Sequence, residues 1–119
     1  MKLTRTYEFQ AAHLLPRVAV THKCSQLHGH SYRVSVTIEG PVDTGTGMVI
    51  DFADVDAVVG SVITSELDHR YLNEVDGLEN PTTENLAMWL WERLQETLPL
   101  LGSVEVAETS SSAAIYDGS

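Results

Sequence analysis

The sequence is poor in cysteine, in basic residues and in long apolar segments, and each shortage argues against a class of protein. Its 119 residues include one cysteine, Cys24, so no internal disulfide framework can form, which fits a reducing compartment. No apolar run approaches the ~20 residues that a membrane-spanning helix needs. The first residues do not form a basic and then apolar leader, so we expect a cytoplasmic protein with no membrane partner.

The charge is unbalanced and unevenly spread. Seven basic residues stand against seventeen acidic ones, for a formal net charge of −10 at pH 7, which argues against nucleic acid as a partner. Five of the seven basic residues lie in residues 1–33, together with one acid. This basic part suits a small anionic ligand better than a polyanion. Length and composition, with no linker or repeat, predict a single domain over 1–119.

Two alternating stretches in the first third of the chain predict β-strands. Apolar residues alternate with polar ones over 3–11 and again from Tyr32 to residue 39. His13 continues the apolar parity of the first stretch, and His28 and His30 share the apolar parity of the second. If the strands pair as an antiparallel hairpin, the end of the first lies beside the start of the second. All three imidazoles then meet on one face of the sheet.

Three converging imidazoles predict a metal site. Zinc binds such ligands readily, and catalytic zinc sites keep a fourth position open for water or substrate. Cys24, four residues before His28, could instead be the fourth protein ligand of a structural site. His28 and His30 could also be ordinary loop residues before a strand, because a His-x-His pattern alone is a weak signal. The sequence leaves these alternatives open.

The rest of the chain predicts two helices followed by two strands. Apolar spacing predicts one helix over 52–66, capped by Asp51, and a second over 82–97, capped by Asn80 or Thr82 and ended by Pro99. Alternation resumes at Val104, and residues 113–116 form a last strand. The element order is therefore strand–strand–helix–helix–strand–strand, an α+β arrangement.

Three further polar residues stand out. Glu108 falls where the third strand expects an apolar residue, and an inward carboxylate costs free energy unless it is paired. It is either an acid that faces a ligand or part of a frayed strand end. Asp68 and His69 follow the first helix, and a carboxylate can set the tautomer of a neighbouring imidazole if the fold turns the two together. The alternative is an exposed pair at a helix end.

These motifs, taken in order, resemble the 6-pyruvoyltetrahydropterin synthase family, and most closely its bacterial branch. The resemblance rests on the motif residues His13, Cys24-x-x-x-His28-Gly29-His30, Leu67-Asp68-His69 and Glu108-Thr109, and on the segments 48–52 and 80–82. It implies the tunnelling fold, in which two helices cover one face of a four-stranded antiparallel sheet and subunits join into a barrel. It also implies a homo-oligomer, a trimer or a hexamer, with sites at subunit interfaces.

The resemblance implies a reaction and a set of roles. The bacterial branch converts 7,8-dihydroneopterin triphosphate to 6-carboxy-5,6,7,8-tetrahydropterin, acetaldehyde and triphosphate, on the route to queuosine. Zn²⁺ would be held by His13, His28 and His30. Cys24 would be the catalytic thiol, with Asp68, His69 and Glu108 in its relay, and Glu108 with Thr109 would anchor the pterin. On charge alone, Arg17, Lys23 and Arg70 are candidates for binding the triphosphate.

Two other functions fit the same motifs. One is 6-pyruvoyltetrahydropterin synthase activity on the same substrate, which retains the side-chain carbons. The other is a non-catalytic zinc or pterin-binding protein in which Cys24 is a fourth zinc ligand. Analysis of the product separates the first from the carbon–carbon lyase, and replacement of Cys24 separates the second.

Overall fold

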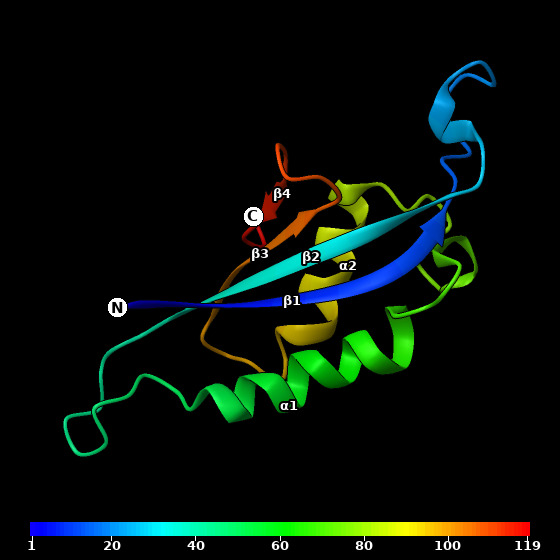
Figure 1. The fold of residues 1–119 in the computed structure, drawn as a ribbon. Helices are drawn as coiled ribbons and strands as arrows, with labels where there is room; N and C mark the ends of the chain where they lie inside the picture. The colour runs from blue at the N-terminus through cyan, green and yellow to red at the C-terminus, as the bar shows by residue number, and fades with distance from the viewer.

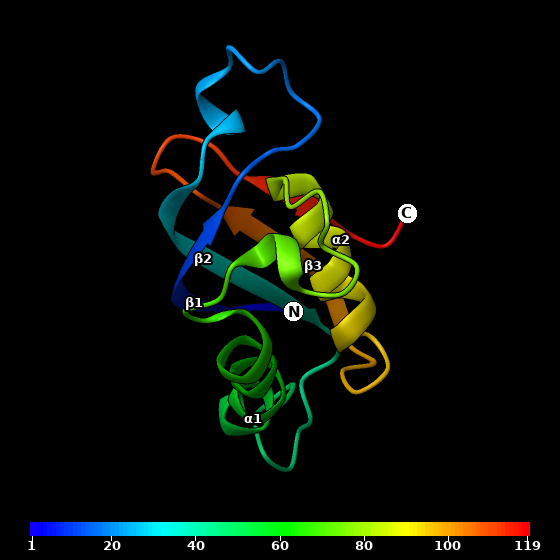
Figure 2. The same cartoon turned by 90° about the vertical axis from the view of Figure 1, so that its right-hand side faces the viewer.

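The computed structural model describes residues 1–119 and contains one four-stranded antiparallel sheet with strand order β1-β2-β3-β4. The strands are β1 (Lys2–His13), β2 (His28–Glu39), β3 (Leu101–Ala107) and β4 (Ala114–Tyr116). The helices α1 (Phe52–Val62) and α2 (Thr83–Leu94) lie between β2 and β3 in sequence and cover one face of the sheet (Figure 1; Figure 2). The predicted fold class, order of elements and placement of the helices are confirmed.

The β1–β2 hairpin is the longest part of the sheet. It pairs without interruption from Lys2↔Glu39 to His13↔His28, so the alternation of both strands stays in phase along their whole length. Inward residues such as Phe9, Tyr32 and Val34 are buried in a single apolar core, whereas Arg5, of the same parity, is exposed and pairs with Asp56. The outward residues are polar and mostly exposed, as in the hydrogen bond between Thr6 and Ser35. This regular pairing fixes where the histidines at the far end must lie.

The helices begin where the capping residues predict and end earlier than the apolar spacing suggests. The Asp51 side chain accepts a hydrogen bond from Ala53 N–H, and the Thr82 side chain accepts one from Asn85 N–H. The predicted helix over 52–66 is α-helical only to Val62, because the chain then widens into a π-helical turn (η2, Ile63–Leu67). This turn buries both Ile63 and Leu67. The helix predicted over 82–97 is shorter by one residue at its start and three at its end.

Three short segments complete the fold. Residues 48–50 lie outside the strands, and Val49 and Ile50 pack against the core. Residues 72–74 form a 3-10 helical turn (η3, Leu72–Glu74) in which Leu72 is fully buried. A second such turn (η1, Lys23–Ser25) carries Cys24 in the long connection between β1 and β2.

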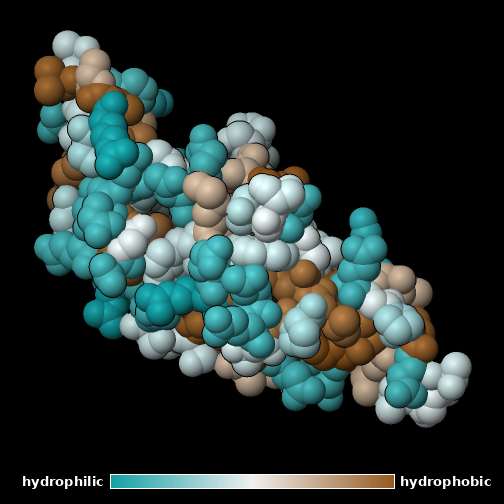
Figure 3. Space-filling view, turned by 180° about the vertical axis from the view of Figure 1, so that it is seen from behind, coloured by the Kyte–Doolittle hydropathy of each residue, from teal (hydrophilic) through white to brown (hydrophobic).

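The molecule is elongated, with a longest dimension of 57 Å, and its two ends differ in character. The connection at residues 14–27 projects from one end (Figure 1). At the other end, apolar side chains including Met48 and Phe52 surround a cavity of about 200 Å³ and are exposed, as the back view shows (Figure 3). None of the helices is long and apolar enough to cross a lipid bilayer.

Candidate functional site

His13, His28 and His30 converge at one end of the β1–β2 hairpin. Strand pairing places His13 opposite His28 and Ala11 opposite His30, so all three rings lie on the core face. One ligand nitrogen from each residue lies within 4.8 Å of the other two, and the Nε2 atoms of His13 and His28 are 2.9 Å apart. The hairpin therefore forms the three-nitrogen cluster that the sequence predicts.

Hydrogen bonds to backbone carbonyls determine the tautomers of two of these histidines. His13 Nδ1 lies 2.9 Å from the Pro81 carbonyl oxygen, and His28 Nδ1 lies 2.7 Å from that of Gln26. A carbonyl oxygen can only accept, so each neutral ring carries its proton on Nδ1 and presents an unprotonated Nε2. Two such atoms 2.9 Å apart cannot hydrogen-bond to each other. A cation between them satisfies both.

His30 supplies independent evidence for a bound cation. Its Nε2 atom is buried and has no hydrogen-bond partner, which is costly in a protein interior. A metal ion held by the three Nε2 atoms would satisfy this atom as well. The donor set, three neutral imidazoles, fits zinc and other divalent transition metals.

Burial favours the neutral form of His13, the form that a metal requires. Its side chain is 1% exposed, and this burial lowers its pKa despite the opposing effects of the Pro81 carbonyl and the Glu108 carboxylate. Tyr32, fully buried beneath it, places its hydroxyl 3.0 Å from His13 Nδ1. The Pro81 carbonyl and the Tyr32 hydroxyl thus both fix the His13 ring through its Nδ1 atom.

Glu108 lies just beyond the end of β3 and faces the histidine cluster. Its carboxylate oxygens are 3.6 Å from His30 Nε2 and 3.9 Å from His13 Nε2. The strand parity that made this acid conspicuous therefore turns it toward the three histidines. Thr109, the next residue, is exposed, and its hydroxyl lies 3.0 Å from that of Ser112.

Cys24 lies on the projecting connection, outside the cluster of ligand atoms. It is a free, half-buried thiol in the turn η1. Its amide N–H donates to His22 Nδ1 over 3.0 Å, and its carbonyl oxygen accepts from Leu15 N–H over 2.7 Å. The groups that could hold an ion comprise the three histidines without the sulfur. This geometry favours an open three-ligand site over one closed by Cys24.

Asp68 and His69 are turned toward each other on the free edge of β1. Asp68 Oδ1 is 3.0 Å from His69 Nδ1 and also accepts a hydrogen bond from Gln10 N–H. These contacts lower the pKa of the Asp68 carboxyl, with the Gln10 N–H having the larger effect. His69 has φ = 59°, a left-handed conformation that is uncommon away from glycine, and its side chain is 78% exposed.

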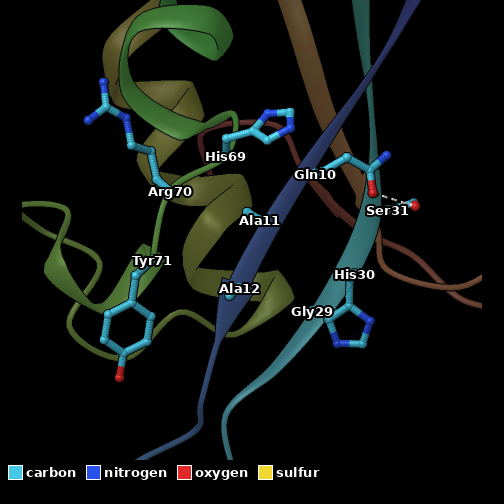
Figure 4. A pocket seen from close by; sticks show the side chains of 9 residues that line it. All are labelled: Gln10, Ala11, Ala12, Gly29, His30, Ser31, His69, Arg70 and Tyr71. Carbon is cyan, nitrogen blue, oxygen red and sulfur yellow. Dashed lines mark hydrogen bonds between the residues drawn. The ribbon is translucent and has the colours of Figure 1, made fainter.

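The segment of His69, Arg70 and Tyr71 runs beside the end of β1 and borders a cavity of about 500 Å³ (Figure 4). The cavity is also lined by Gln10 and His30, but Cys24 is not among its lining residues. The His69 ring contacts Asp68, whereas Cys24 contacts the connection between the strands. The predicted thiol and the Asp–His pair therefore belong to different surfaces of the chain.

The three candidate triphosphate ligands do not share one surface either. Arg17 borders a separate cavity of about 430 Å³ with Asn80 and Arg93, and Lys23 lies in η1 beside Cys24. Arg70 lines the cavity of His69 and donates to the Ser65 carbonyl.

The backbone carbonyl groups that determine the histidine tautomers could not be predicted from the sequence. The sequence around Pro81 predicts a helix start and contributes to the family resemblance, but neither reveals that the Pro81 carbonyl is the partner of His13. A carbonyl group leaves no mark on residue type, so no sequence signal points to it. The proline itself is the nearest hint, since it fixes the backbone beside the buried ring.

The fold and the histidine cluster together define a family. A family model described as 6-pyruvoyl tetrahydropterin synthase matches residues 2–119. The chain therefore belongs to this family. It is 45% identical over 117 residues to 6-carboxy-5,6,7,8-tetrahydropterin synthase from Synechocystis, covering 94% of this chain and 89% of the relative. These matches make the chain an enzyme of pterin synthesis, a lyase.

More distant relatives extend the same similarity. The human 6-pyruvoyl tetrahydrobiopterin synthase is 34% identical over 132 residues, covering 98% of this chain and 91% of the relative. The structure of the Caenorhabditis elegans 6-pyruvoyl tetrahydropterin synthase superposes with a TM-score of 0.91 at 30% identity, covering 100% of this chain and 96% of that one.

Proposed function

We propose that this protein is a zinc-dependent lyase that converts 7,8-dihydroneopterin triphosphate to 6-carboxy-5,6,7,8-tetrahydropterin, acetaldehyde and triphosphate, with consumption of water. The observation that carries the proposal is the set of three converging Nε2 atoms, two of them unprotonated and the third buried without a partner. The 45% identity to the Synechocystis synthase supports the choice of product.

His13, His28 and His30 are the proposed metal ligands. Bound zinc would supply Lewis acidity, acidifying a hydroxyl of the substrate side chain and the adjacent C–H bond. Glu108 faces the same nitrogens without belonging to the cluster of three ligand residues. A three-histidine set with one open position is the arrangement of catalytic zinc sites, whereas structural sites are closed by four protein ligands.

Glu108 is the proposed anchor of the pterin ring. Its carboxylate accepts hydrogen bonds, and a pterin presents adjacent N–H donors along one edge. With its oxygens 3.6–3.9 Å from two histidine nitrogens, Glu108 would hold the ring with its side chain directed at the metal position. Thr109, immediately after it, would add a hydroxyl contact at the same edge.

Cys24 is the proposed proton carrier at the substrate side chain, and Asp68 with His69 completes its relay. Because Cys24 and the Asp–His pair occupy different surfaces of one chain, we propose that the relay forms between two copies. The exposed ring of His69 would approach the Cys24 of a neighbouring subunit. This arrangement is consistent with a homo-oligomer, a trimer or a hexamer built from barrels of joined sheets.

The triphosphate would be held by basic residues that assembly gathers, with Arg17, Lys23 and Arg70 as candidates. The product would supply the synthesis of queuosine and other deazapurines. A reducing compartment such as the cytoplasm would keep the single thiol free for its role.

The test is to incubate the purified, zinc-loaded protein with 7,8-dihydroneopterin triphosphate and to analyse all products. The proposal predicts acetaldehyde and a 6-carboxy pterin in equal amounts. A 6-pyruvoyl product that keeps every side-chain carbon would assign the sister activity instead. Tight zinc binding without turnover of this substrate would indicate a binding protein and overturn the proposal.

A further inference from the structure

The side chain of Asn73, in the turn η3, makes three hydrogen bonds to two other backbone segments, one at Leu14 and one at Glu79. Its Oδ1 accepts from Leu14 N–H over 3.0 Å, and its Nδ2 donates to the Leu14 carbonyl over 2.9 Å. The same Nδ2 lies 3.4 Å from the Glu79 carbonyl oxygen. Leu72, the buried neighbour of Asn73, fixes the turn in the core. One amide thus ties together three parts of the chain.

The bonds to Leu14 hold the backbone immediately after His13. Strand pairing with β2 ends at His13↔His28, so Leu14 has no partner in the sheet. On the other side of the histidine, Ala12 N–H donates to the Arg70 carbonyl over 3.0 Å. The segment 70–73 therefore holds the chain at Ala12 and at Leu14. At Leu14 the Asn73 side chain supplies the two backbone hydrogen bonds that a neighbouring strand would otherwise supply.

The bond to Glu79 concerns the ring of His13 rather than its backbone. Glu79 lies two residues before Pro81, whose carbonyl accepts the Nδ1 proton of His13. The Asn73 amide thus contacts both the chain that carries this histidine and the segment that fixes its tautomer. His13 itself is 1% exposed and makes no side-chain contact with Asn73 among its hydrogen bonds.

We infer that Asn73 is a positioning residue for the metal centre, which holds His13 Nε2 at the point where His28 and His30 converge. The inference rests on the proposed metal site and deepens it. Groups that orient a metal ligand without touching the metal alter affinity by about 10–100-fold when removed. Asn73 does not contact the His13 ring directly. It acts through the backbone after His13 and through the segment that contains Pro81.

The test compares Zn²⁺ affinity, measured by competition with a chromophoric chelator, in the parent chain, in Asn73→Ala and in Asn73→Asp. A matched control is Tyr7→Phe, which removes the 2.6 Å hydrogen bond from another β1 side chain to Asp56 on α1. Absorption spectra of the Co²⁺-loaded proteins report the ligand geometry independently of activity. Thermal unfolding of each metal-free variant measures the general loss of stability.

We expect Asn73→Ala to bind Zn²⁺ about 10–100-fold more weakly and to change the Co²⁺ spectrum. Asn73→Asp keeps the acceptor for Leu14 N–H but sets a carboxylate oxygen against the Leu14 and Glu79 carbonyls, so it should also bind Zn²⁺ about 10–100-fold more weakly; it carries the test if the alanine variant does not fold. Tyr7→Phe should stay within about twofold of the parent, since its contact lies outside the site.

Two results would overturn the inference alone: parent-like affinity and spectra in the Asn73 variants, or an equal loss of affinity in Tyr7→Phe. A parent chain that takes up no Zn²⁺ would overturn the proposed function and the inference with it.

Discussion

Replacement of Cys24 by alanine separates catalysis from metal binding in this protein. The turn that carries Cys24 is held by backbone contacts to His22 and Leu15, none of which involves the sulfur. The thiol is half-buried, so we expect its loss to change the free energy of unfolding by less than about 1 kcal/mol. Zinc affinity should be unchanged, because the sulfur lies outside the cluster of histidine nitrogens.

Turnover should respond very differently. A positioned proton carrier contributes about 10²–10⁴-fold to a rate, which corresponds to about 3–5 kcal/mol of activation free energy. We therefore expect Cys24→Ala to lose acetaldehyde production by that factor while it remains folded and metal-loaded. The difference between the effect on stability and the effect on the barrier identifies the role of the thiol.

The assay measures three quantities on the same preparation: bound zinc by elemental analysis, thermal unfolding, and acetaldehyde by a coupled dehydrogenase. Cys24→Ser, which replaces the thiol by a hydroxyl of similar size, serves as a control. Loss of zinc together with the thiol would show that Cys24 is a metal ligand and would refute the open-site interpretation. Turnover near that of the parent would refute the role of the thiol in proton transfer.

Three further predictions concern the same site. Burial lowers the pKa of His13 in the folded chain below the ordinary value of 6.5 that it has in the unfolded chain. Between these two pKa values the unfolded chain binds a proton that the folded chain does not. The metal-free protein should therefore lose stability as pH falls through about 6.5. Urea unfolding across this range checks it, and an equal slope in His13→Gln would contradict it. Inactive Cys24→Ala and His69→Ala chains should regain activity when refolded together, because mixed oligomers contain some sites with both wild-type residues; a mixture as inactive as its components would argue against a shared relay. Glu108→Gln should keep its zinc and lose about 10–100-fold in kcat/KM, since the pterin would lose a charged acceptor; an unchanged kcat/KM would remove Glu108 from the binding site.

The sequence predicted the parts of the site that follow from strand periodicity. His13, His28 and His30 could be placed on one face because alternation and antiparallel pairing carry a residue's parity along a strand. Glu108 could be placed by the same parity, although it lies one residue beyond the end of β3. These predictions needed only local pattern and one assumption about pairing.

What the sequence could not predict depends on contacts between segments far apart in the chain. Asn73 lies outside the strands and helices that the sequence predicts, and its bonds to Leu14 span 59 residues. The π-helical turn after Val62 breaks the apolar spacing only slightly, so the spacing predicts one continuous helix over 52–66. In the proposed oligomer, the relation between Cys24 and His69 would depend on how copies assemble, which the pattern of one chain does not specify.

The segment that carries His69 also limits how a neighbouring sheet can join this one. His69 N–H donates to the Gln10 carbonyl, while Gln10 N–H and Ala12 N–H donate to Asp68 and Arg70, so these outward groups of β1 are already occupied. By alternation, only the outward backbone groups from Lys2 to Glu8 remain for an incoming strand. In the proposed oligomer, the Asp–His pair would thus limit how far the edge strands of two subunits could overlap.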